Sequence, residues 1–326
     1  MTGPFAFCGI GVARRGQRQF AISQQPFLRV DADSPFRVAS VSKLVVGQAL
    51  AGLLAEKGLS WATPAQDVLG WSLSHPDDSN AAVTIGQLAG HSSGLTDDGG
   101  YLLAENTTLA AHIRDTGVWS SEPGTYFRYS NLGYIILGEV IEALSGREFP
   151  DAVAAWVPEG GSFNWAGAGA GHLRAALPTY RRDGQRFLPQ IDAPPVLPKP
   201  SGTVARFSPQ GGLRLSLSGM LDLAERLPQA DQTVLWRHSD GPGDYLDGVF
   251  ADYGAGLQIF ANPSFYPRPL IGHFGNAYGF NGGVWYDAET GTSFAYALNG
   301  LELGDEDDSF SAAELAIFAA VAAQGG

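Results

Sequence analysis

The stretch from residue 42 to residue 57 is the strongest constraint on the fold, because it predicts a helix that is apolar on almost every side. A helix at a protein surface carries a single apolar stripe, so this one has to be buried by other elements all around it. Gly58 follows at the position where helices commonly end. The apolar positions that set the pattern are Leu44, Val45, Val46, Ala49, Leu50, Ala51, Leu53 and Leu54.

Strand patterns lie near both ends of the chain. Residues 5–30 alternate apolar and polar side chains around a turn at residues 14–17, which predicts a hairpin. Residues 247–299 contain three strand-like runs separated by Gly, Pro and Asn, and residues 312–323 predict a closing helix. These elements favour an antiparallel sheet that is built from both chain ends and flanked by helices.

The expected fold class is therefore α/β (α+β), with a mostly helical lobe inserted into the sheet lobe. We assign residues 1–60 and 206–326 to a discontinuous α/β lobe and residues 61–205 to the helical lobe, with the active site in the cleft between them. A Pro-rich segment at residues 192–202 is expected to be extended. Small polar residues that can cap the predicted helices are Thr84, Ser130 or Asn131, and Ser216 or Ser218.

Ser40 and Lys43 stand at the beginning of the buried helix, three residues apart. At this spacing two side chains share one face of a helix, so the lysine nitrogen is expected beside the serine hydroxyl. Burial disfavours a charged lysine and moves its pKa down, and a neutral amine can activate a serine as a nucleophile. The alternative is a capping serine beside a lysine that extends toward solvent.

Two further motifs follow along the chain, Tyr129-Ser130-Asn131 and His273-Phe274-Gly275. Together with residues 36–43 (FRVASVSK), they resemble the three active-site motifs of the serine β-lactamase and penicillin-binding-protein superfamily, in its class C β-lactamase-like branch. That resemblance implies a β-lactamase-like fold, and it covers residues 5–323 with the motifs in the family's order. Supporting landmarks are residues 88–95 (LAGHSSGL), 211–213 (GGL) and 253–257 (YGAGL).

The resemblance implies catalytic roles for Ser40, Lys43 and Tyr129. Ser40 would attack a carbonyl and form an acyl-enzyme, while Lys43 and Tyr129 share the proton transfers, with the charge of Lys43 favouring a tyrosinate. Which of the two takes the serine proton is left open. Asn131 would orient the substrate and Lys43, and the backbone N–H groups of Ser40 and Asn276 would form the oxyanion hole.

The resemblance also implies a substrate-binding strand around the third motif. His273 would line the cleft and hydrogen-bond the substrate or Tyr129, Gly275 would belong to the same binding edge, and Tyr278 would border the pocket. Each residue type also has an ordinary structural reading: His273 as a buried structural histidine, Tyr129 as a strand-end aromatic and Asn131 as a helix cap. His91 is expected to be structural.

The third motif departs from the family, because histidine replaces the lysine of Lys-Thr-Gly. A histidine is mostly neutral at pH 7 and offers no fixed charge to a substrate carboxylate. Relatives that carry histidine here include esterases and D-aminopeptidases. The expected function is a carboxylesterase-like or D-aminopeptidase/carboxypeptidase-like serine hydrolase. The alternatives are β-lactamase activity proper, acyl transfer, or a catalytically inactive binding protein of the same fold.

Composition bounds the partners. The formal net charge is −13, which disfavours nucleic acid and anionic membranes as partners. Cys8 is the only cysteine, and the histidines show no metal-ligand spacing, so we expect no disulfide, metal or cofactor. No signal peptide is evident, and no run of about 20 apolar residues suggests a membrane span, so we expect a cytoplasmic protein. The expected partner is a small ester or amide substrate, and the oligomeric state stays open.

Overall fold

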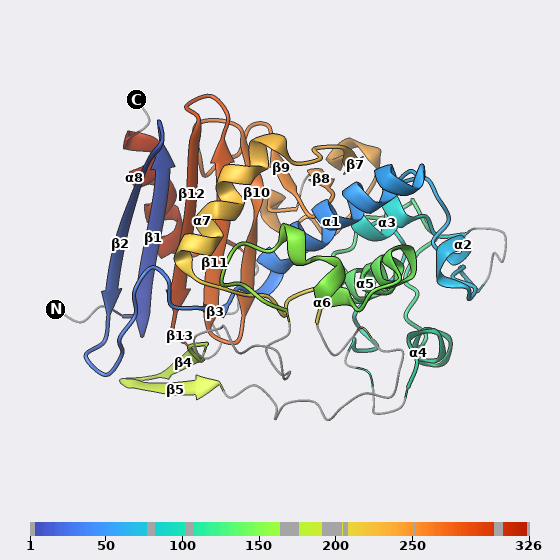
Figure 1. The fold of residues 1–326 in the computed structure, drawn as a ribbon, viewed down its shortest axis with the longest axis horizontal. Coiled ribbons are helices and arrows are strands. Elements are labelled where there is room, and N and C mark those ends of the chain that lie inside the picture. Colours follow the sequence, from blue (N-terminus) through green and yellow to red (C-terminus); the bar gives the residue numbers. More distant parts are fainter. Residues whose placement is uncertain are drawn as a thin grey trace.

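An eight-stranded antiparallel sheet forms one side of the computed structural model, in the order β2-β1-β12-β11-β10-β9-β8-β7 (Figure 1). Both chain ends contribute to it, which confirms the predicted fold class. The structure describes residues 4–76, 82–101, 103, 107–163, 176–190, 204, 208–250, 252–302 and 309–324. The strands are β1 Phe7–Arg14, β2 Gln17–Gln24, β7 Val234–Trp236, β8 Asp252–Gly254, β9 Gln258–Phe260, β10 Leu270–Ala277, β11 Phe280–Asp287 and β12 Thr292–Asn299.

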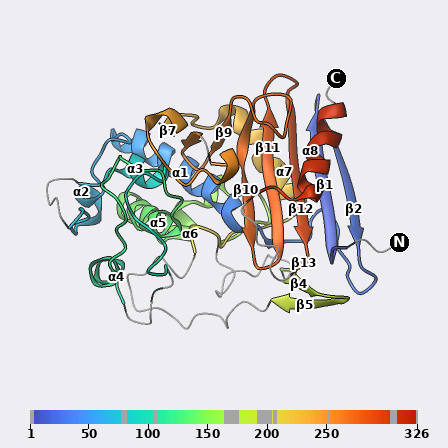
Figure 2. The same ribbon diagram turned by 180° about the vertical axis from the view of Figure 1, so that it is seen from behind.

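Helices cover both faces of this sheet. Helix α7 lies on the face toward the viewer in Figure 1, and α8 lies on the opposite face, as Figure 2 shows. Because both faces are covered, all eight positions of β12 are buried. The α-helices are α1 Ser42–Lys57, α2 Gln66–Leu69, α3 Ile85–Ala89, α4 Leu109–Thr116, α5 Asn131–Ser145, α6 Phe149–Ala152, α7 Leu217–Arg226 and α8 Ala312–Gln324.

Helix α1 runs through the middle of the molecule, between the sheet and α5 (Figure 1). It begins and ends where the sequence predicts, and Gly58 closes it in the left-handed conformation at φ 68°. The stretch Ala39–Lys57 is long and apolar enough to cross a membrane by length and composition alone. However, 67% of its apolar window is buried within the fold, as expected of a core helix.

Two features of the strands differ from the sequence prediction. Residues 247–299 form five strands instead of three runs, because a turn at Gly256 (φ 73°) separates β8 from β9 and a turn at Tyr278 and Gly279 (φ 56° and 80°) separates β10 from β11. The segment assigned to a helical lobe also contains a hairpin, β4 Thr179–Asp183 and β5 Arg186–Gln190, which pairs with β13 Leu301–Glu302. The Pro-rich stretch 192–202 lies outside the described residues.

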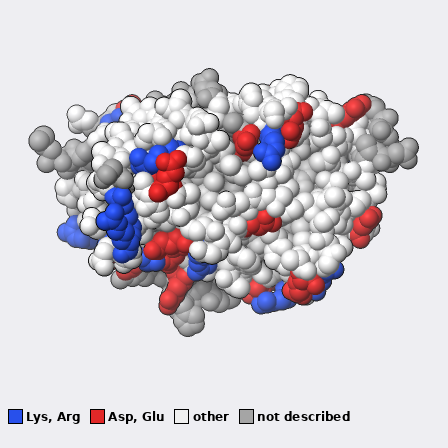
Figure 3. All heavy atoms as spheres, turned by 90° about the horizontal axis from the view of Figure 1, so that it is seen from above, with Lys and Arg blue, Asp and Glu red and all other residues white. Residues whose placement is uncertain are grey.

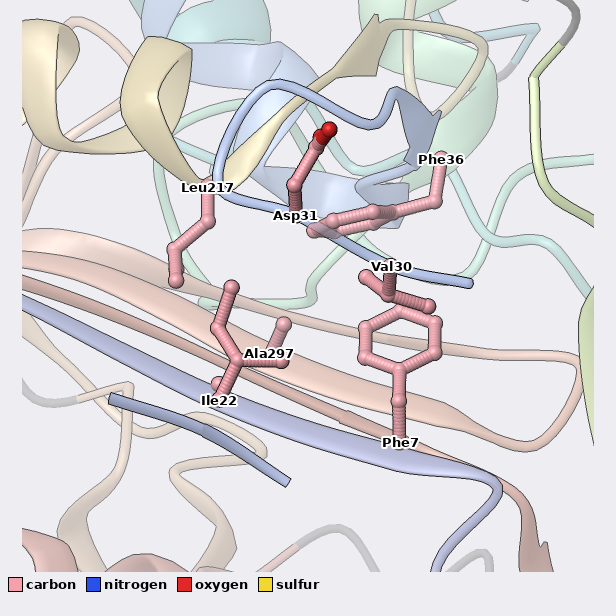
Figure 4. A pocket seen from close by; sticks show the side chains of 8 residues that line it. Phe7, Ile22, Val30, Asp31, Phe36, Leu217 and Ala297 are labelled. Carbon is pink, nitrogen blue, oxygen red and sulfur yellow. The ribbon is translucent and has the colours of Figure 1, made fainter. Parts of the chain in front are cut away.

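The segment between β2 and α1 packs against the edge of the sheet where β1 begins. The short strand β3 (Phe36–Arg37) pairs with β6 (Arg214–Leu215). The rings of Phe7 and Phe36 lie 5.2 Å apart there. Figure 4 shows the side chains that line a small pocket at this junction. They come from β1, β2, β12, β3, the start of α7, and Val30 and Asp31 in the loop before β3. This apolar junction fixes the direction in which the chain leaves β3 toward the candidate nucleophile.

Charged groups of both signs are interspersed over the face seen from above (Figure 3). A group of charged side chains ties the β1–β2 hairpin to the covering helix: Arg18 of β2 pairs with Asp222 and Glu225 of α7. Exposed ion pairs of this kind contribute little to stability, so the sheet and α7 are held together mainly by their apolar contacts.

Helix α1 passes so close to the turn between β8 and β9 that only glycine fits at Gly47. A β-carbon there would lie 2.1 Å from the carbonyl oxygen of Ala255, whereas a β-carbon at Gly133 in α5 would be no nearer than 3.5 Å to its neighbours. We predict that Gly47→Ala lowers the free energy of unfolding by about 1–3 kcal/mol through overpacking. Gly133→Ala should be neutral or slightly stabilising, since alanine is the better helix former. Equal changes in denaturant unfolding of the two variants would contradict this close approach.

Candidate active site

Ser40 and Lys43 lie side by side at the beginning of α1. Ser40 sits in the short 3₁₀ turn η1 (Ala39–Val41), and Lys43 is in the first turn of the helix that follows. The Lys43 Nζ lies 3.1 Å from the Ser40 Oγ, as their spacing predicts. Ala39 has a φ of 48°, in the left-handed region that few non-glycine residues adopt. The turn thus carries backbone strain directly before the serine, a feature often found at functional sites.

The amine of Lys43 is completely buried and has three hydrogen-bond partners. Besides the Ser40 Oγ, these are the Asn131 Oδ1 at 2.9 Å and the backbone carbonyl of Gln210 at 2.8 Å. The last two can only accept. A neutral amine has two N–H groups and one lone pair, so these two acceptors use both N–H groups. The lone pair is then left for the hydroxyl proton of Ser40.

Burial lowers the pKa of Lys43 from 10.5 to about 7, and the negative charge of Asp97 acts in the opposite direction. The ring of Tyr129 lies 4.7 Å from the Nζ and that of Tyr134 lies 5.3 Å away. Cation–π contact with these two rings partly stabilises the protonated form of Lys43. A large fraction of Lys43 is therefore neutral near pH 7.

Tyr129 lies against both Ser40 and Lys43, as expected, but its ionisation differs from the expectation. Burial raises the pKa of Tyr129 well above 10, although a hydrogen bond with Ser40 lowers it in part. The predicted tyrosinate is thus wrong for the free protein, because the desolvation of the phenol outweighs any help from Lys43. Tyr129 is a neutral phenol, and its ring is stacked on Phe250 with the centroids 4.6 Å apart.

Asn131 joins this group through Asp97, a residue that the sequence analysis did not identify. Ser130 caps α5, and Asn131 is the first residue of that helix. The Asp97 Oδ2 accepts hydrogen bonds from the backbone N–H of Asn131 at 2.8 Å and from its Nδ2 at 2.9 Å. The Asp97 Oδ1 accepts from the Ser130 hydroxyl and the Leu132 N–H. Asp97 follows the landmark at residues 88–95, but nothing in its spacing points to Asn131.

His273 does not line the site as expected. Its side chain is fully buried, and Nε2 lies 2.6 Å from the Tyr253 hydroxyl, while Nδ1 contacts the carbonyl of Phe274. Burial, together with the charge of Lys43, lowers the pKa of His273 to about 3. Both ring nitrogens are occupied within the protein, so the expected bond to Tyr129 is not formed. The alternative reading of His273, a buried structural histidine, describes this position.

The rest of the third motif lies directly against the candidate nucleophile. A β-carbon at Gly275 would lie 2.4 Å from the Val38 carbonyl and 3.2 Å from the Ser40 nitrogen, so only glycine lets β10 pass this turn. Asn276 is the next residue and is half-buried. Tyr278 follows in the turn to β11, with a φ of 56° and an exposed fraction of 40%.

Two buried polar side chains, His91 and Ser42, hydrogen-bond the backbone next to the site residues. His91 is buried, with a φ of 59°, and its Nδ1 accepts a hydrogen bond from the Ser130 N–H at 3.1 Å. This contact agrees with the structural role predicted for His91. Ser42 is also buried; its hydroxyl donates to the Ala39 carbonyl at 2.6 Å and accepts from the Leu213 N–H at 3.0 Å. Ser42 thereby fixes the strained turn that carries Ser40.

Within the part of the chain that the structure describes, no three His, Cys, Asp or Glu side chains gather in a way that could hold a metal ion. The groups next to the Ser40 hydroxyl are instead the amine of Lys43, which also contacts the Asn131 amide, and the phenol of Tyr129, while β10 passes close to the Ser40 nitrogen. This set can remove a proton from a hydroxyl and stabilise negative charge that develops on a carbonyl oxygen.

Ser42→Ala tests the support of the turn. The Leu213 N–H would lose its partner, and the Ala39 carbonyl would keep its bond from the backbone N–H of Ser42 but lose the one from the hydroxyl. We predict a loss of about 1–3 kcal/mol in the free energy of unfolding, measured by denaturant titration. The control is Ser72→Ala, at an exposed serine whose hydroxyl has one partner among the described residues, the Ser74 hydroxyl at 3.4 Å. A Ser42→Ala variant as stable as this control would contradict the proposed support.

Both the sequence and the fold of this chain are similar to those of known proteins. The sequence is similar to the D-aminopeptidase of Brucella anthropi, with 26% identity over 310 residues that cover 87% of this chain and 53% of that protein. It is also 30% identical to penicillin-binding protein 4 of Amycolatopsis lactamdurans over 132 residues, which cover 38% of this chain and 33% of that protein. The chain thus spans about half the length of the first relative.

Solved structures show the same fold. A beta-lactamase/D-alanine carboxypeptidase from Yersinia pestis superposes with a TM-score of 0.74 at 15% identity, covering 98% of this chain and 93% of that one. The D-amino acid amidase of Ochrobactrum anthropi SV3 gives 0.72 at 17% identity with the same coverage. The sequence model of the family described as Beta-lactamase matches residues 8–317. The chain therefore belongs to the beta-lactamase family.

Proposed function

We propose that this protein is a serine hydrolase that cleaves a small ester or amide through a covalent acyl-enzyme on Ser40. The observation that carries the proposal is the 3.1 Å contact between the Lys43 Nζ and the Ser40 Oγ. The other two partners of the amine, the Asn131 Oδ1 and the Gln210 carbonyl, are acceptors. Membership of the beta-lactamase family supports it. A protein that only bound a ligand would not need a buried lysine with a lowered pKa in contact with a serine hydroxyl.

In the proposed acylation step, the Ser40 Oγ attacks the substrate carbonyl and Lys43 takes its proton. The pKa shifts favour Lys43 over Tyr129 as the base, because the pKa of Lys43 is lowered to about 7 and that of Tyr129 is raised. The backbone N–H groups of Ser40 and Asn276 would stabilise the oxyanion. Tyr129, as a neutral phenol, would give its proton to the leaving group as the carbonyl–heteroatom bond breaks, and it would regain a proton from the protonated Lys43, which becomes neutral again. In the second step a water molecule gives a proton to Lys43 and attacks the acyl carbon; the bond from that carbon to the Ser40 Oγ breaks, and the oxygen takes the proton back.

The substrate class follows in part from the third motif. His273 is buried, and its pKa is lowered to about 3, so it brings no positive charge to a substrate carboxylate. This disfavours efficient β-lactamase activity and favours an ester or an amide without a carboxylate at that position. The names of the relatives, a D-aminopeptidase and a D-amino acid amidase, support D-aminoacyl amides as the first amides to test. Tyr278 would border the acyl-binding side.

The test is covalent labelling with a fluorophosphonate probe, read by intact-mass spectrometry and peptide mapping. The wild-type protein should gain one adduct on Ser40 and should hydrolyse p-nitrophenyl acetate and butyrate. Ser40→Ala and Lys43→Ala should both lose labelling and turnover by at least about 10³-fold. Lys57→Ala, at the exposed end of the same helix, is the matched control and should behave like wild type. An adduct that survives Ser40→Ala would overturn the proposal in favour of a binding protein.

Substrate profiling separates the alternatives within this mechanism. D- and L-phenylalanine amide, the p-nitrophenyl esters and a chromogenic cephalosporin should be compared by kcat/KM. We expect turnover of the esters or the D-amide to exceed that of the cephalosporin by at least about 100-fold. Comparable turnover of the cephalosporin would make β-lactamase activity the better assignment. Product analysis with an added alcohol or amine would reveal acyl transfer.

A further inference from the structure

Asp97 is a charged residue of the site to which neither the sequence motifs nor the comparisons assign a role. It is half-buried in the loop that follows α3, and it faces the N-terminus of α5. Its carboxylate accepts four hydrogen bonds from three consecutive residues, at distances from 2.8 to 3.1 Å. A carboxylate at a helix N-terminus is stabilised by the helix dipole, and both oxygens of Asp97 act as acceptors here.

The contact with the Asn131 side chain has a consequence for Lys43. An amide group has one accepting and one donating end. Because Asp97 can only accept, the Nδ2 of Asn131 must point toward it, at 2.9 Å. The Oδ1 must then point the other way, where it lies 2.9 Å from the Lys43 Nζ. If the amide were turned over, its N–H₂ group would face the amine and compete for the lone pair.

We infer that Asp97 is a positioning residue of the proposed hydrolase: it holds the Asn131 amide with its oxygen toward Lys43, and so reserves the lone pair of the neutral amine for the Ser40 hydroxyl. This inference rests on the proposed function. It makes the direction of the hydrogen bonds at Lys43 depend on a carboxylate that touches neither the nucleophile nor the base.

The charge of Asp97 also acts on Lys43 directly, and it favours the protonated amine. The pH dependence therefore separates a positioning role from a purely structural one. Without this charge the protonated amine is less stable, so Lys43 should lose its proton at lower pH. The acid limb of the pH–rate profile, in which the rate rises as Lys43 becomes neutral, should then move to lower pH. The titratable groups that face Lys43 from the elements packed around it are Asp97, Tyr129, Tyr134, His91 and His273.

The experiment is the pH profile of fluorophosphonate labelling of Ser40 in the full chain, with thermal unfolding measured alongside. For Asp97→Asn we expect a plateau rate lowered about tenfold to a hundredfold, and an acid limb moved down by about half a pH unit or more. The matched control is Ser130→Ala, which removes another bond to the same carboxylate and the cap of α5 but leaves Asn131 and the charge in place. This variant should unfold at a lower temperature than the wild type. Its acid limb should stay at the same pH, and its plateau labelling rate should lie within about threefold of that of the wild type.

Asp97→Glu provides the second variant, because it keeps the charge but displaces the acceptor. It should keep the acid limb in place and lose at least about tenfold of the plateau rate. A folded Asp97→Asn that matches Ser130→Ala in limb and plateau would overturn the inference. If Asp97→Asn does not fold, Asp97→Glu with a wild-type plateau would overturn it instead. A wild-type protein that is not labelled at Ser40 would overturn the proposed function, and this inference with it.

Discussion

A lysine side chain that is completely shielded from water is the constraint on which the rest of the site depends. The pKa of Lys43 falls from 10.5 to about 7 through burial. At and below pH 7, holding this amine in the fold costs roughly 5 kcal/mol relative to the unfolded chain. Because the folded-state pKa is the lower one, the stability of the fold rises with pH between about 7 and 10.5. The surrounding core has to offset this cost, and in return the protein gains a neutral amine beside a hydroxyl.

Close contacts between backbone segments hold the amine of Lys43 in position beside Ser40. Gly47 and Gly256 let α1 lie against the turn between β8 and β9, where a β-carbon at Gly256 would be 2.1 Å from the Lys43 carbonyl. Gly275 lets β10 pass the turn that carries Ser40. Side chains could not be accommodated at these contacts without moving α1 or β10. The sheet, the central helix and the nucleophile turn are therefore one rigid arrangement, built from segments near both ends of the chain.

Local patterns were sufficient to predict the hairpin, the buried helix with its end at Gly58, and the contact between Ser40 and Lys43. Each depends on spacing within a single element. The partners of the lysine could not be predicted in this way, because Asn131 and Gln210 are 88 and 167 positions away from it. Asp97 was missed for the same reason. The position of His273 was misjudged because the motif alone does not indicate that its ring turns toward the buried Tyr253 hydroxyl.

The most direct test of this account is an NMR titration of lysine side chains labelled with ¹³C at Cε. Lys43, Lys57 and Lys199 are the only lysines, so three signals are expected, and Lys43→Met identifies one of them by its absence. We predict that this signal titrates with a midpoint at about pH 7. A midpoint above about pH 9 would mean that Lys43 is charged at neutral pH, and it would contradict a neutral lysine as the base that activates Ser40.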